Sequence, residues 1–162
     1  LALVMGYAAA VAVGSSGFVL GTIVLLSALV VAASRRAHWP RLVPVGIALG
    51  YATYLVWAIG NPFLGGAFRL APGPKLAPAV LLAIAVVFAL GPLLRPNRET
   101  EEPVVCIGAL LNCAFGYSLF LVHTAAAFAP LFAGAHVLAS VVFLGLATLF
   151  WVRERSRVST FF

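Results

Sequence analysis

The feature that most constrains this chain is a short basic turn, 34–41, set between two long stretches without charge. Residues 1–33 contain no charged side chain, and a second apolar stretch follows the turn. An arginine at the centre of a lipid bilayer costs roughly 2.5 to 3.5 kcal/mol on insertion scales. We therefore expect Arg35, Arg36 and Arg41 at a water interface, and we expect the apolar arms on both sides of them to enter the membrane.

The composition of the whole chain indicates the same class of protein. Of the 162 residues, 64% are hydrophobic and 9% are charged, whereas about 25% of the residues in a soluble domain are charged. A soluble fold of this size could not bury so much apolar surface, so an integral membrane protein is predicted. The net charge of +6 does not indicate a nucleic-acid partner, because the cations lie in short loops or flanks between apolar stretches.

Turns and charged clusters divide the chain into six predicted helical spans. A span needs about 20 apolar residues, and the expected spans are 1–13, 18–33, 42–60, 76–94, 104–122 and 129–152. Together they predict an all-α transmembrane bundle, a single module over 1–162 built from tandem helical hairpins. Because the first span is too short to be complete, we expect the module to belong to a longer chain.

The glycine and serine residues that separate the first two spans allow two interpretations. Gly14, Ser15, Ser16 and Gly17 can form the turn of a hairpin. Alternatively, residues 1–33 form one long helix that is broken at this point, and the break is then a candidate binding site within the membrane.

The basic clusters also predict an orientation. If the first turn is cytoplasmic, alternation of the spans places three clusters on that side: 35–41, 95–98 and 153–157. They contain Arg35, Arg36, Arg41, Arg95, Arg98, Arg153, Arg155 and Arg157, whereas the opposite side receives only Arg69 and Lys75. Such an excess of arginine is typical of the cytoplasmic face. We therefore expect a bacterial inner-membrane protein in which these arginines anchor the topology.

Glycine–tyrosine pairs support the hairpin arrangement. Gly6-Tyr7, Gly50-Tyr51 and Gly116-Tyr117 all lie in spans that are predicted to run outward from the cytoplasm. These pairs contain three of the four tyrosines. We interpret each outward span and the inward span that follows it as one repeated hairpin.

Two short sequence words accompany this layout, Arg35-Arg36-x-x-Trp39 in the basic turn and Leu110-Leu111-Asn112 after a proline–arginine loop. In these features the chain resembles a segment of the large, many-span bacterial membrane proteins that are grouped as an uncharacterised domain-of-unknown-function family. The resemblance covers the whole chain. It implies a long array of hairpins, and it assigns no activity and no functional residue.

The acidic residues argue against catalysis within the membrane. The chain contains no Asp, and none of its four acidic residues lies inside a predicted span. Proton-coupled transport and metal-dependent hydrolysis usually place a carboxylate at membrane depth. We therefore expect no catalytic residue, no metal site and no cofactor, and we predict that the chain is not an enzyme.

Two histidines are the candidates for cofactor binding. His123 and His136 flank the turn between the fifth and sixth spans, and imidazoles on neighbouring helices can ligate a haem iron or a metal. The interpretation that we favour is structural. In that interpretation His123 lies among the lipid headgroups, and His136 forms a hydrogen bond with a neighbouring helix.

Small and polar residues within the spans predict helix contacts. Gly17-x-x-x-Gly21 and Gly46-x-x-x-Gly50 have the spacing of close-packing motifs. Asn112 lies at mid-span, where its amide needs a partner, and interhelical hydrogen bonds of this kind average about 0.6 kcal/mol. The hydroxyl residues are expected to bond their own helix backbone; they are Thr22, Ser27, Thr53, Ser118, Ser140 and Thr148.

Three functional hypotheses follow from these observations. The first is a non-catalytic structural and association module of a larger membrane protein or complex, with membrane lipids and other transmembrane helices as its partners. The second is a membrane carrier or lipid-handling transporter with a broken helix at Gly14 to Gly17. The third is the membrane subunit of a redox complex, in which His123 and His136 are the ligands.

Overall fold

The computed structural model describes residues 1–13, 15–37, 39, 41–62, 65, 74–93 and 103–154. Within these ranges the chain folds into six α-helices and contains no strand. The helices are α1 (Ala2–Val13), α2 (Ser16–Arg36), α3 (Leu42–Ala58), α4 (Ala77–Leu93), α6 (Pro103–Ala127) and α7 (Phe132–Glu154). A short 3-10 helix, η2 (Ala129–Leu131), precedes α7. The predicted all-α class is confirmed.

Among the described helices, three segments are long and apolar enough to cross a membrane, judged by length and composition. They are Ser16–Arg36, Pro103–Ala127 and Ala129–Val152. The helices α3 and α4 contain 17 residues each, which corresponds to about 25 Å of helix, a little less than the roughly 30 Å of a bilayer core. The long apolar helices support the prediction of a membrane protein.

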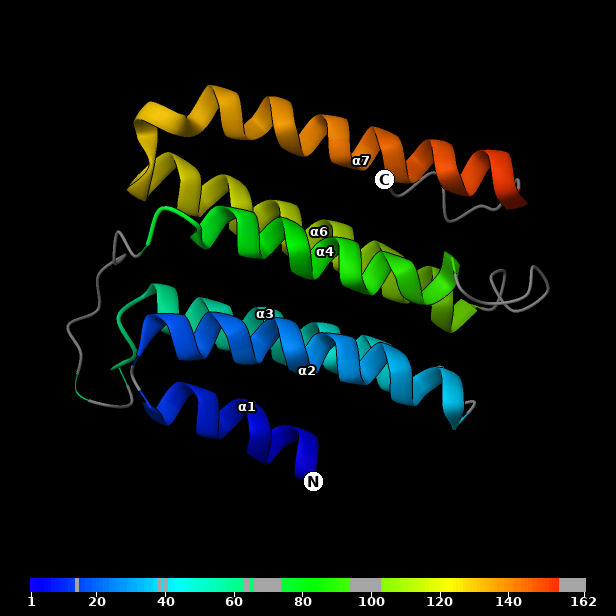
Figure 1. The fold of residues 1–162 in the computed structure, drawn as a ribbon, viewed down its shortest axis with the longest axis horizontal. Helices are drawn as coiled ribbons and strands as arrows, with labels where there is room; N and C mark the ends of the chain where they lie inside the picture. Colours follow the sequence, from blue (N-terminus) through cyan, green and yellow to red (C-terminus); the bar gives the residue numbers. More distant parts are fainter. Residues whose placement is uncertain are drawn as a thin grey trace.

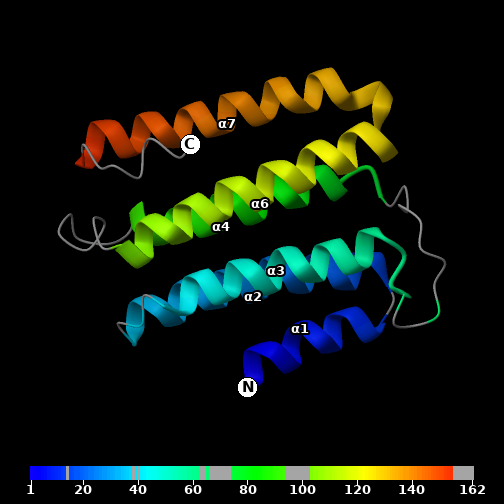
Figure 2. The same cartoon turned by 180° about the vertical axis from the view of Figure 1, so that it is seen from behind.

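The helices lie side by side with alternating directions (Figures 1 and 2). In the view of Figure 1, α2 lies in front of α3, and α4 lies in front of α6. These four helices pack extensively on one another and form the centre of the bundle. At one edge α1 packs against α2 and α3, and at the other edge α7 packs less extensively against α4 and α6.

Residues 1–33 form a hairpin and not one broken helix. α1 ends at Val13, α2 begins at Ser16, and the two helices pack against each other in opposite directions (Figure 1). The alternative of a single long helix is therefore wrong. Gly14, at the predicted break, lies outside the described residues.

The helices that carry arginine have those residues at the same end of the bundle. α2 ends at Arg36, Arg41 immediately precedes α3, and Arg153 lies in the last turn of α7. The C-terminal end of α4 and the N-terminal end of α6 lie at this end too (Figure 1). We call it the arginine end, and we call the opposite end, where Lys75 precedes α4, the lysine end. The predicted anchors that lie outside the described residues are Arg95, Arg98, Arg155 and Arg157.

Prolines help to set where the helices begin. Pro44, Pro78 and Pro103 each lie within the first three residues of a helix. The first turn has N–H groups without an intrahelical acceptor, so the N–H that proline lacks is not missed there. The bounds of the helices therefore follow from local sequence.

The end of α3 connects three helices at the lysine end. Gly60 and Asn61 adopt left-handed conformations, with φ of 86° and 48°, which end the helix in the usual way. The Asn61 side chain then donates a hydrogen bond of 2.8 Å to the carbonyl of Val11, near the C-terminus of α1. The Trp57 indole donates to the Ser16 hydroxyl, at the start of α2, over 3.3 Å. The Val11 carbonyl lies in the last turn of α1, where it has no intrahelical donor, and Asn61 satisfies it.

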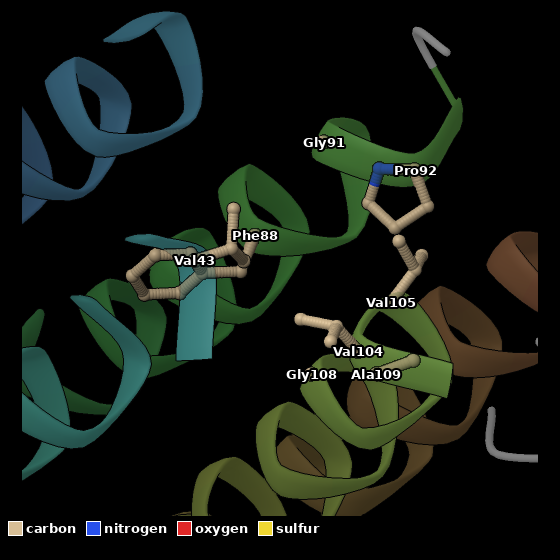
Figure 3. Close-up of a pocket in the computed structure, with 8 residues that line it drawn as sticks. All are labelled: Val43, Phe88, Gly91, Pro92, Val104, Val105, Gly108 and Ala109. Atoms are coloured by element: carbon tan, nitrogen blue, oxygen red, sulfur yellow. The ribbon is translucent and has the colours of Figure 1, made fainter. Parts of the chain in front are cut away.

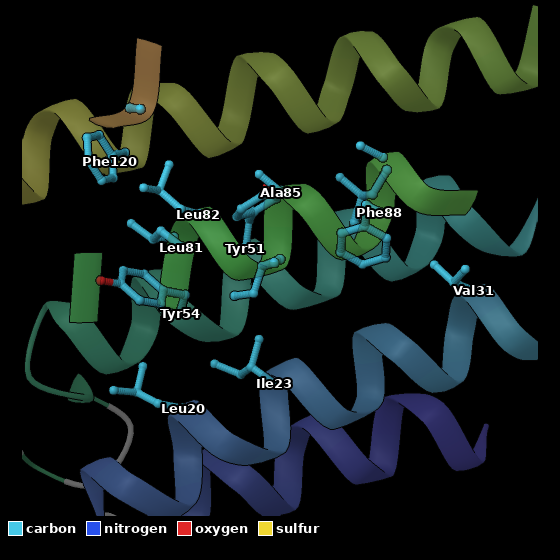
Figure 4. Close-up of a cluster of buried hydrophobic side chains, with 14 of the residues drawn as sticks. Leu20, Ile23, Val31, Tyr51, Tyr54, Leu81, Leu82, Ala85, Phe88 and Phe120 are labelled. Carbon is cyan, nitrogen blue, oxygen red and sulfur yellow. The ribbon is translucent and has the colours of Figure 1, made fainter. Parts of the chain in front are cut away.

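The interior of the bundle is closely packed. Figure 4 shows buried side chains of α2, α3 and α4 converging, among them Ile23, Tyr51 and Phe88. By contrast, large apolar side chains such as Leu25 and Leu144 are exposed on the outside. Polar residues such as Ser27 and Asn112 are buried inside. Buried polar residues together with exposed apolar residues suit a bundle whose solvent is lipid.

Candidate functional site

In two of the three glycine–tyrosine pairs, the tyrosine packs against the glycine of the next pair along the chain. A Cβ atom added to Gly50 would lie 3.5 Å from the Tyr7 hydroxyl oxygen, and one added to Gly116 would lie 2.6 Å from the Tyr51 hydroxyl oxygen. Glycine therefore lets a tyrosine approach the backbone of the neighbouring helix. The third tyrosine, Tyr117, is 41% exposed and contacts α7 instead.

The Tyr51 hydroxyl belongs to a hydrogen-bonded link between three helices. It donates to Asn112 Oδ1 over 2.7 Å, and Asn112 Nδ2 donates to the Ala85 carbonyl over 2.9 Å. Asn112 is only 1% exposed, so both halves of its amide need the partners that they have. The sequence indicated that Asn112 required a partner, and the structure identifies that partner on α3 and α4.

A second polar contact joins the first hairpin. The hydroxyls of Tyr7 and Ser27 are 3.4 Å apart and share a hydrogen bond, so Ser27 contacts α1 and not its own helix backbone as predicted. The backbone bond expected for hydroxyl residues is present at Thr53, Ser140 and Thr148, each of which donates to the carbonyl four residues earlier. These hydroxyls are thus satisfied within or between helices.

His123 is buried between α3 and α6, which corrects the expectation that it lies among headgroups. It is 2% exposed, and its Nδ1 lies 2.6 Å from the Tyr54 hydroxyl. The ring also packs against Trp57 and Phe128. The reason is the length of α6, which continues to Ala127 and so keeps His123 within the helix. The span predicted from the sequence ends at residue 122.

His136 joins α6 to α7. Its Nε2 lies 3.1 Å from the Thr124 hydroxyl, and its Nδ1 lies 3.5 Å from the Tyr117 hydroxyl. The side chain is half-buried and packs against Phe132. The hydrogen bond to a neighbouring helix that was expected for His136 is therefore present.

The hydrogen bonds described for the two histidines are made with different partners. His123 faces α3, whereas His136 bonds residues of α6 from its place on α7. Among the residues that the structure describes, no group of three or more His, Cys, Asp or Glu side chains could hold a metal ion. The arrangement favours hydrogen bonding between helices for both imidazoles.

The two glycine motifs differ although their spacing is the same. A Cβ atom on Gly46 would lie 2.6 Å from Val30 Cγ1, so this glycine allows α2 and α3 to pack closely. Gly17 and Gly21 have no neighbouring atom within 4 Å of such a Cβ. The prediction that Gly17 and Gly21 mediate packing is therefore wrong for the described helices, because their face of α2 meets open space.

The cavity in Figure 3 lies near the arginine end between α3, α4 and α6, and it is small. Its volume is about 20 Å³, and the residues around it are apolar, including Val43, Phe88 and Val105. A buried water needs two to four polar partners, which these side chains do not offer. This cavity has no room for a substrate.

Two further hollows at the surface of the bundle are larger and are lined by residues that the structure describes. One, the lysine cleft, has a volume of about 330 Å³ and lies between α4, α6 and α7, with Lys75 in its lining. The other, the side groove, has a volume of about 370 Å³ and lies between α1 and α3. The side groove has no charged residue in its lining, so the two hollows differ in chemistry.

No protein-family model, no curated protein and no solved structure matches this chain. The function is therefore inferred from the contacts of the described residues.

Proposed function

We propose that this chain is a non-catalytic structural module of a larger bacterial inner-membrane protein or complex, and that it works by packing helices together. The observation that carries the proposal is the link from Tyr51 through Asn112 to Ala85. It joins α3, α6 and α4 by hydrogen bonds of 2.7 and 2.9 Å in the centre of the bundle. Polar groups that a carrier would present to a substrate are here bonded to one another.

The closeness of the helices supports the same proposal. Tyr51 packs against Gly116, and Val30 packs against Gly46. Neighbouring helices therefore interdigitate, with a larger side chain of one helix placed against a glycine of the next. Alternating access requires one group of helices to move against another. Interlocked side chains of this kind oppose such movement, because each must leave its place before the helices can slide.

The proposal includes a six-span topology with the arginine end at the cytoplasmic face. Its support is the position of Arg36, Arg41 and Arg153 at one end of the bundle, together with the excess of arginine that cytoplasmic loops carry. In this topology the shorter helices also cross the membrane. The resemblance to many-span bacterial proteins implies that the same hairpin array extends beyond these residues.

Cysteine accessibility tests the proposal against a carrier. In a background in which Cys106 and Cys113 are replaced by alanine, Ser27→Cys and Thr53→Cys report on the interior, and Ser15→Cys is the matched control at the exposed lysine end. In membrane vesicles, a membrane-impermeant maleimide is expected to label only the control. Labelling of Ser27→Cys from either side would reveal a water-filled pathway and refute the module.

A further inference from the structure

The lysine cleft is large and almost entirely apolar. Its volume of about 330 Å³ corresponds to roughly eleven water molecules at about 30 Å³ each. Its walls include Leu82 of α4, Phe120 of α6 and Leu138 of α7. Apart from Lys75, the one polar side chain in the lining is Thr124, whose hydroxyl already bonds the Phe120 carbonyl over 2.6 Å and His136 over 3.1 Å. Water therefore has little reason to fill the cleft, and an apolar occupant fits it.

Small residues on α4 and α7 create the space. Ala79 faces the cleft from α4, and Gly134 and Ala135 face it from α7. A Cβ atom added to Gly134 would meet no atom within 4 Å. Protein interiors are packed as densely as organic crystals. The lysine cleft, by contrast, lies at the surface and is not closed by the side chains around it. In a bilayer the molecules available to fill it are lipids.

Among the described residues that line the cleft, Lys75 is the one cation. Lys75 is the only lysine in the chain, its side chain is exposed, and it precedes α4 by two residues at the lysine end. None of the residues that line the cleft is acidic. A lysine ammonium at a helix end extends toward the headgroups and binds phosphate as a point charge.

We infer that the lysine cleft holds one acyl chain of a membrane phospholipid, and that the phosphate of the same lipid pairs with Lys75. The apolar walls account for the chain, and the ammonium accounts for the headgroup. The side groove offers a similar volume without a cation, so it is not expected to select a phospholipid. This inference concerns a bound lipid and does not depend on whether the bundle is a structural module.

Filling the cleft tests where the acyl chain lies. Gly134→Leu places a side chain in the open space of the cleft, and Gly145→Leu is the matched control, because a Cβ on Gly145 also meets no atom within 4 Å and Gly145 does not line the cleft. Each full-length variant is purified in a mild detergent, incubated with phosphatidylglycerol and examined by native mass spectrometry. Wild type and Gly145→Leu are expected to retain one phospholipid, and Gly134→Leu is expected to lose it. Equal retention by all three would overturn the inference.

The lone lysine tests where the phosphate lies. Lys75→Gln is expected to weaken retention by about two- to fivefold, as for a single exposed ion pair, whereas Lys75→Arg is expected to preserve it. An amine-specific acylating reagent gives a second measurement on the wild-type chain. Phosphatidylglycerol vesicles are expected to protect Lys75, and inorganic phosphate in detergent is not. Protection by inorganic phosphate alone would show an adventitious anion contact and would overturn the assignment to a lipid.

Discussion

Replacing a helical glycine by alanine usually stabilises a protein, but at Gly116 we expect the same substitution to destabilise it. In Gly116→Ala the new Cβ would lie 2.6 Å from the Tyr51 hydroxyl oxygen and 3.1 Å from Tyr51 Cζ. The tyrosine must therefore move away from α6. Since its hydroxyl is also the donor to Asn112, this movement breaks the link between α3 and α6.

The size of the effect follows from three contributions. The lost interhelical hydrogen bond is worth about 0.6 to 1.7 kcal/mol in a membrane protein, and overpacking a closely packed site costs about 1 to 3 kcal/mol. Alanine offsets this loss because it favours a helix by about 1 kcal/mol relative to glycine. We expect Gly116→Ala to lower the free energy of unfolding by about 1 to 4 kcal/mol.

Gly50→Ala is the matched control, since Gly50 also precedes a tyrosine in α3. Its added Cβ would lie 3.5 Å from both Ser27 Oγ and the Tyr7 hydroxyl, which is ordinary van der Waals contact. Gly50→Ala is therefore expected to be neutral or to stabilise by up to about 1 kcal/mol. Reversible unfolding of the purified chain in mixed micelles of increasing sodium dodecyl sulfate content, followed by tryptophan fluorescence, measures both variants.

A double variant separates the clash from other effects of alanine. Tyr51→Phe removes the hydroxyl that Gly116→Ala would meet, so the double variant should be about as stable as Tyr51→Phe alone, within roughly 0.5 kcal/mol. Strict additivity of the two substitutions would contradict the proposed contact. Equal destabilisation by Gly116→Ala and Gly50→Ala would refute the reasoning as well, because it would show that the distances to tyrosine do not decide the outcome.

Three further predictions use the same unfolding measurement. Gly46→Ala should destabilise by about 1 to 3 kcal/mol through a clash with the β-branched Val30, which has little rotamer freedom; Val30→Ala in the same chain should relieve most of that loss, and no relief would contradict the contact. Asn112→Ala should lower the free energy of unfolding by about 1 to 3 kcal/mol because the Ala85 carbonyl and the Tyr51 hydroxyl lose their partner. No measurable decrease would show that the hydrogen bonds of Asn112 do not stabilise the bundle. Gly17→Ala should be neutral or stabilise by up to about 1 kcal/mol, since the added methyl meets open space; a clear destabilisation would restore Gly17 as a packing residue.

Helix positions were predictable because each helix is bounded by local signals. The basic turn ends α2 and precedes α3, and Pro78 and Pro103 lie in the first turns of α4 and α6. These signals depend on residues within one or two turns of the helix end. The C-terminus of α6 is the main departure, because the alanines from Ala125 to Ala127 favour continued helix.

Contacts between helices were much less predictable. The spacing of Gly17 and Gly21 is the same as that of Gly46 and Gly50, yet only the second pair packs against a neighbouring helix. A spacing of four places two residues on one face of a helix and does not indicate whether a neighbour covers that face. Likewise, the sequence indicated that Asn112 needs a partner but not which residue it is. Tyr51 is 61 residues away in the chain, and the two side chains meet only because of how three helices are packed.

The capping of α1 by Asn61 imposes an order on synthesis. The side chain that satisfies the Val11 carbonyl is made 50 residues later, which at about 5 to 20 residues per second is roughly 3 to 10 s of translation. Until α3 has been synthesised and its C-terminus has adopted the left-handed conformation, α1 packs only against α2, its partner in the hairpin. The packing of α1, α2 and α3 therefore reaches its final arrangement as one unit, and a ribosome that stalls before residue 61 would leave α1 without this cap.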